Sequence, residues 1–96
     1  ISDWEGKSCE PSYKELVGEA YTRAGLQVAF NWPYLGGRVT QTYGQPEKGQ
    51  HAIQVEISRA LYMDEDSKAW IPEKAQALSE KLKTAVRYIH EQLADL

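Results

Sequence analysis

The sequence predicts an α/β or α+β fold, a fragment of a mixed sheet flanked by helices. Three observations support this class. The predicted elements follow the order helix, strand, strand, strand, helix. The first helix leads directly into a strand, which is typical of a β-α-β crossover. The strand that should precede that helix has no counterpart in residues 1–10, which look like a loop. We therefore expect the chain to hold only part of a larger sheet.

Both helices are predicted from their first residues and from their apolar spacing. Pro11 suits the first turn of a helix, and Gly25 suits the position just after its end. The apolar stripe of this helix consists of Tyr13, Leu16, Val17, Ala20, Tyr21 and Ala24. The last helix begins at Pro72 and has a charged face opposite an apolar one. Its apolar face consists of Ala75, Leu78, Leu82, Ala85, Val86, Ile89 and Leu93.

Three short runs predict strands: LQVAF at 26–30, RVTQTY at 38–43 and HAIQVEIS at 51–58. Glycine and proline make 31–37 a loop and 44–50 a turn-rich connection, and 62–71 reads as a polar connection. The run 51–58 alternates strictly, with Ile53, Val55 and Ile57 on the expected core side. Gln54 and Glu56 therefore project together on the other side.

Charge and composition exclude several functional classes. The 96 residues include 11 basic and 14 acidic side chains, a net charge of −3. This balance argues against nucleic acid as a partner, because binding to a phosphate backbone needs a clustered basic face. No apolar run approaches the roughly 20 residues of a membrane span, so no membrane partner is expected. The single cysteine, Cys9, forms no internal disulfide, which fits a reducing, cytoplasmic environment.

The residues alone leave the chemical role of the central stretch open. His51 and His90 lack the spacing of metal ligands, so no metal site is expected within this chain. The pair Gly36-Gly37 is either a plain turn or a place where another group closely approaches the backbone. A carboxylate such as Glu56 on a half-buried strand is usually solvated. The alternative is that a second layer covers this face and Glu56 lines a cleft, which His51 joins only if the strand twists or bulges.

Residues 31–65, NWPYLGGRVTQTYGQPEKGQHAIQVEISRALYMDE, carry a family pattern. This stretch resembles the C-terminal signature of the N-formylglutamate amidohydrolase family, N-x-P-[YF]-x-G-G-[YF]-x-T-R-x-Y-G-x-P, then G-x-H-A-[LI]-Q-[LIV]-E-[LIM], then Tyr-Met-Asp-Glu. The helix–strand stretch upstream also looks like the family's. Two positions depart from the pattern. Arg38 stands where an aromatic residue is usual, and Gln41 stands where an arginine is usual.

The resemblance implies that residues 1–96 form the C-terminal part of such a domain, similar in its complete form to zinc carboxypeptidases. It implies metal-dependent hydrolysis of the amide bond of an N-acylated amino acid such as N-formylglutamate, with zinc ligands outside this chain. By the same resemblance, Glu56 is the general base. The residues it implies for substrate binding are Asn31, Gly36, Gly37, Thr40, Tyr43, His51 and Gln54.

The family arginine that Gln41 replaces would be the anchor for a substrate carboxylate. Arg38, on the opposite face of the predicted strand, is not expected to replace it. The resemblance also implies that the chain alone is inactive and that its partners are the small-molecule substrate and the missing N-terminal part of the domain. The alternative is a small stand-alone α+β binding or interaction module without catalysis, in which Gln54 and Glu56 are solvated.

Overall fold

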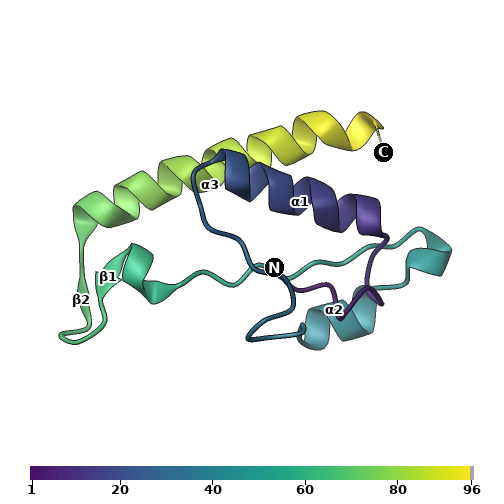
Figure 1. The fold of residues 1–96 in the computed structure, drawn as a ribbon, viewed down its shortest axis with the longest axis horizontal. Coiled ribbons are helices and arrows are strands. Elements are labelled where there is room, and N and C mark those ends of the chain that lie inside the picture. Colours follow the sequence, from purple (N-terminus) through teal and green to yellow (C-terminus); the bar gives the residue numbers. More distant parts are fainter. Residues whose placement is uncertain (96) are drawn as a thin grey trace.

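The computed structural model describes residues 1–95, which form three α-helices and one two-stranded antiparallel sheet (Figure 1). The α-helices and strands are α1 (Pro11–Arg23), α2 (Arg38–Tyr43), β1 (Met63–Asp64), β2 (Ala69–Trp70) and α3 (Pro72–Gln92). Short 3-10 turns span Pro46–Lys48, Arg59–Leu61 and Leu93–Asp95. The shape is elongated, with extents of 44 × 27 × 17 Å. Helices α1 and α3 pack against each other, and α2 lies on the other side of the chain's N-terminus.

The two long helices confirm the predictions from apolar spacing. Helix α1 begins at Pro11, and the chain leaves it through Gly25, whose φ of +95° favours glycine. Its buried residues Leu16 and Ala20 belong to the predicted stripe, as do Leu78 and Ala85 of α3. The apolar core of the described chain therefore lies largely between these two helices.

The prediction of a strand at 38–43 is wrong, because these residues form α2. The Thr40 hydroxyl accepts a hydrogen bond from the backbone N–H of Gly37 at 2.9 Å, which satisfies one of the free donors at the helix start. The Gly44 N–H then donates to the Thr40 carbonyl and ends the helix. These local hydrogen bonds outweigh the weak β propensity of Val39, Thr40 and Thr42.

The prediction of strands at 26–30 and 51–58 is wrong for the described residues, because neither segment is a strand in the structure. Both segments run without helical turns (Figure 1), and only Gln54 forms an isolated β-bridge. Their partner is the N-terminal end of the chain, which lies between them. Ile1 exchanges hydrogen bonds with Ala29 and Asn31, and Ser2 forms an isolated antiparallel bridge with Gln54. Residues 1 and 2 thus lie between the two segments, with hydrogen bonds to each.

The sequence reading of 62–71 as a polar connection missed the hairpin of β1 and β2, in which Met63 pairs with Trp70 and Asp64 with Ala69. The Asp64 side chain accepts hydrogen bonds from the N–H groups of Asp66 and Ser67 and stabilises the turn. None of the helices described in residues 1–95 is long and apolar enough to cross a membrane.

The only cysteine, Cys9, is free and 1% exposed, and burial raises the pKa of its thiol to about 11, with the charge of Asp3 acting in the same direction. The folded state therefore favours the neutral thiol. This contribution to stability is fully present below the ordinary pKa of 9.0 and is lost as the pH rises through about 11.

We expect iodoacetamide to alkylate Cys9 much more slowly in the folded chain than in urea between pH 7 and 9, because the thiolate is the reacting form. The gap should narrow as the pH approaches the raised pKa. Mass spectrometry of timed reactions measures both rates. Equal rates at pH 8 with and without urea would contradict the burial of this thiol.

Candidate functional site

The extended segment 51–58 carries the candidate catalytic residue. Gln54 and Glu56 lie on the same side, as the alternation predicts, and Nε2 of Gln54 donates a hydrogen bond to Oε1 of Glu56. The backbone of Gln54 is itself held by two hydrogen bonds with Ser2, of 2.8 and 2.9 Å. Glu56 is exposed, so one carboxylate is oriented by a neighbour and remains open to solution.

The glycine pair brings the start of α2 against Gln54. A Cβ on Gly37 would lie 2.7 Å from Oε1 of Gln54, and a Cβ on Gly36 would lie 2.4 Å from Oγ1 of Thr40. Gly36 also has a φ of +146°, a conformation that side chains disfavour. The pair is therefore a place of close approach rather than a plain turn. Gly36, Gly37, Thr40, Gln54 and Glu56 form one group, the Glu56 cluster.

Thr40 holds the cluster together from inside. Its side chain is fully buried, and its hydroxyl donates to the Gly37 carbonyl at 2.9 Å. The same oxygen accepts the Gly37 N–H. With both functions used within the loop, Thr40 shapes the glycine backbone and does not present its hydroxyl to a ligand.

Asn31 is likewise occupied by the protein itself. Its Oδ1 accepts the N–H groups of Asp3 and Glu5, and its Nδ2 donates to Oδ1 of Asp3 at 2.8 Å. Asp3, 1% exposed, was missed by the sequence reading, which treated residues 1–10 as a loop. Its signal was the spacing D-x-x-G, since Oδ1 of Asp3 also accepts the Gly6 N–H in a tight turn.

His51 and Tyr43 are not brought to the cluster. Nδ1 of His51 accepts the Glu10 N–H at 3.1 Å, and its ring stacks on Tyr13 with the centroids 3.9 Å apart. An accepting Nδ1 places the proton of the neutral ring on Nε2. His51 therefore anchors the entry to α1. The side chain of Tyr43 is exposed at the end of α2, and its carbonyl accepts a hydrogen bond from Gln50.

The Glu56 cluster contains a single ionisable side chain, that of Glu56. Within residues 1–95, no group of three or more His, Cys, Asp or Glu side chains is placed to hold a metal ion. The cluster therefore offers a carboxylate that can accept a proton and a carboxamide that orients it, but no metal centre of its own.

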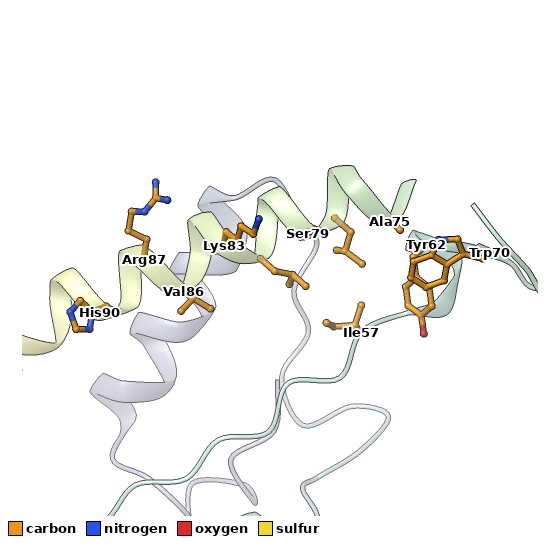
Figure 2. A pocket seen from close by; sticks show the side chains of 11 residues that line it. Ile57, Tyr62, Trp70, Ala75, Ser79, Lys83, Val86, Arg87 and His90 are labelled. Atoms are coloured by element: carbon orange, nitrogen blue, oxygen red, sulfur yellow. The ribbon is translucent and has the colours of Figure 1, made fainter. Parts of the chain in front are cut away.

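Ile57, the residue after Glu56, lines an open apolar groove of about 970 Å³ along α3. Figure 2 shows Ile57 between the aromatic pair Tyr62 and Trp70 and the side chain of Val86. Ile57 is 38% exposed, although the alternation predicted a core position. Segment 51–58 thus carries an uncovered apolar side chain, Ile57, directly after the candidate residue Glu56.

Comparisons with known proteins agree on one family. The family model described as N-formylglutamate amidohydrolase matches residues 1–63. The chain is 36% identical over 63 residues to N-formylglutamate deformylase of Pseudomonas aeruginosa, which covers 65% of this chain and 24% of that protein. It is 35% identical over 66 residues to the Pseudomonas putida deformylase, which covers 68% of this chain and 25% of that protein.

A solved structure extends the likeness over the whole fold. The crystal structure of N-formylglutamate amidohydrolase from Ralstonia eutropha JMP134 superimposes with a TM-score of 0.78 and 27% identity. The match covers 99% of this chain and 34% of that one. The chain thus spans about a quarter of these curated relatives and a third of the solved one. The match to the family model over residues 1–63, together with this fold, shows that the chain belongs to the N-formylglutamate amidohydrolase family.

Proposed function

We propose that this chain is one part of an N-formylglutamate amidohydrolase-like domain and contributes its general base, Glu56. The reaction is hydrolysis of the amide bond of an N-acylated amino acid such as N-formylglutamate. The observation that supports this assignment most directly is the hydrogen bond from Gln54 to an otherwise exposed Glu56. A carboxylate oriented in this way on an extended segment is suited to proton transfer.

In the proposed reaction, Glu56 accepts a proton as water attacks the amide carbon. It then passes the proton to the leaving nitrogen as the C–N bond breaks. The products are a carboxylate from the acyl group and the free amino acid. Gln54 keeps one carboxylate oxygen in place, and Gly37 leaves room for the Gln54 side chain that does so. General acid–base catalysis of this kind contributes about 10²–10⁴-fold to a rate.

The residues described here do not form a metal site, so no step of this proposal runs through a metal. The zinc that the family resemblance implies would have its ligands in the remaining part of the fold. We place that remainder N-terminal to this segment, in a zinc-carboxypeptidase-like mixed sheet in the cytoplasm. The free, buried Cys9 is consistent with that reducing compartment.

Helix α2 changes the expectation for the substrate carboxylate. On a strand, Arg38 and Gln41 would point to opposite faces, but on α2 they are three residues apart and share one face. Both side chains are exposed. We infer that the Arg38 guanidinium takes the role of the arginine that the family pattern has at position 41, since it can bind a carboxylate through two parallel hydrogen bonds.

The general base is tested in a chimera in which residues 1–95 replace the matching third of the Ralstonia enzyme. Glu56→Gln should lower kcat for N-formylglutamate by about 10²–10⁴-fold, because the amide cannot accept the proton. Steady-state kinetics measures the loss, and metal analysis of the same samples checks that the site remains loaded.

Glu47→Gln is the matched control, since Glu47 is an exposed carboxylate on the 3-10 turn away from the cluster. Its kcat should stay within about twofold of the parent chimera. If Glu56→Gln retains activity within a few fold while metal is bound, Glu56 is not the base.

The carboxylate anchor is tested in the same chimera. Arg38→Gln should raise KM for N-formylglutamate by about tenfold or more, the cost of losing a charged hydrogen-bonded pair, with a smaller change in kcat. Adding Gln41→Arg to that variant should recover most of the loss. An unchanged KM in Arg38→Gln would rule out this role for Arg38.

A further inference from the structure

Residues 26–31 and 54–58 pair with residues 1–2 from opposite sides. Beyond that pairing, the backbone edges of both segments are open. The backbone N–H groups of Gln27 and Ala29 have no hydrogen-bond partner within residues 1–95. The same holds for the N–H groups of Glu56 and Ser58. Unpaired donors along an extended edge are a template for another strand. Figure 1 shows that the two segments lie beside each other at the N-terminus and diverge from there.

The register of a strand between these edges is set by Ile1 and Ser2. Ile1 donates to the Ala29 carbonyl at 2.9 Å and accepts the Asn31 N–H at 2.8 Å, which is the pattern of a parallel pair opposite Phe30. Ser2 and Gln54 exchange both hydrogen bonds, which is the pattern of an antiparallel pair. Residues 1–2 are thus the end of a strand with a neighbour on each side.

We propose that the open edges form a binding site for one β-strand that runs into Ile1 in line with Ser2, parallel to 26–30 and antiparallel to 54–58. Counting back from the two observed pairs, the position immediately before Ile1 falls opposite Glu56 and Ala29. The second position back falls opposite Ile57 and Val28. The strand satisfies the N–H groups of Gln27, Ala29, Glu56 and Ser58.

The chemistry of the strand follows from the two faces of segment 51–58. Positions opposite Ile57 face the groove along α3, lined also by Leu78, Leu82 and Val86, and so carry apolar side chains. Positions opposite Glu56 share its face. The match leaves two thirds of the solved relative's chain outside this segment, so the family fold has chain to supply such a strand.

The topology agrees with this occupant. A strand entering at Ile1, then α1, then the parallel segment 26–30 makes a β-α-β unit, the connection that the helix–strand order implies. The added strand also pairs with the backbone of Glu56 on one side, while Gln54 holds its side chain. Only this consequence for catalysis rests on the proposed function of Glu56, because the strand site depends on backbone geometry alone.

The test compares the 96-residue chain with two extended versions. One carries Val-Thr-Val-Thr-Val-Thr directly before Ile1, which places valine opposite Ile57. The other carries Thr-Val-Thr-Val-Thr-Val, with the same composition and the opposite parity. Hydrogen exchange of individual amides is followed by NMR, and thermal unfolding by circular dichroism.

The first extension should slow exchange by about tenfold or more at Gln27, Ala29, Glu56 and Ser58. The amides of Val28, Val55 and Ile57 point to the outer edges and should change little. Should the 96-residue chain prove unfolded alone, only the first extension should give a cooperative transition. No protection at the four amides, or equal effects of both extensions, would overturn the proposal. None of these readouts depends on hydrolysis, so an inactive enzyme bears on the proposed function alone.

Discussion

The backbone pairing of Ser2 with Gln54 is the constraint on which the rest of the structure depends. Together with the bonds from Ile1 to Ala29 and Asn31, it ties the start of the chain to two segments from distant parts of the sequence. Residues 26–30 connect to the helical layer through α1, and residues 51–58 carry the Glu56 cluster. Without the hydrogen bonds of Ile1 and Ser2, few backbone hydrogen bonds would join the helices to the Glu56 cluster.

The second constraint is close approach at glycine. Gly37 lets the start of α2 meet Gln54, Gly36 makes room for Thr40, and Gly44 lets the end of α2 meet Ser8, where a Cβ would lie 2.4 Å from Cβ of Ser8. These contacts replace a conventional apolar core on this side of the molecule. Besides Cys9 and Ala52, the buried side chains here are small and polar: Ser2, Asp3, Ser8 and Thr40. Their hydrogen bonds fix loops that no sheet supports.

Elements defined by apolar spacing could be predicted from the sequence, whereas elements fixed by individual hydrogen bonds could not. Helices α1 and α3 were predictable because their apolar faces recur at helical spacing and bury against each other. The six residues of α2 were not, because β-branched composition favoured a strand while a single threonine hydroxyl decided the outcome. Residues 26–30 and 51–58 were predicted as strands, but in the described chain they form only isolated pairings, since alternation gives the faces of a strand and not its neighbours. For the candidate site, parity alone placed Gln54 beside Glu56. The hydrogen bonds of Asn31 with Asp3 and of His51 with Glu10 join residues distant in sequence, so they could be found only in the folded structure.

Segment 51–58 connects the fold to the proposed chemistry because one of its faces requires access to solvent and the other requires burial. For the proposed reaction Glu56 must stay open to water and substrate. Covering Ile57, the next residue, would remove an apolar side chain from water. Alternation meets both needs only if the backbone between them is fixed, since a one-residue slip would exchange the faces. In the described chain that backbone is paired at Gln54 and unpaired from Val55 to Ile57. The register of Glu56 is therefore set only from its N-terminal side, by the Gln54–Ser2 pair and by the Ala52 N–H bond to the Ser8 carbonyl. Whatever pairs with residues 55–58 determines how firmly the carboxylate is held.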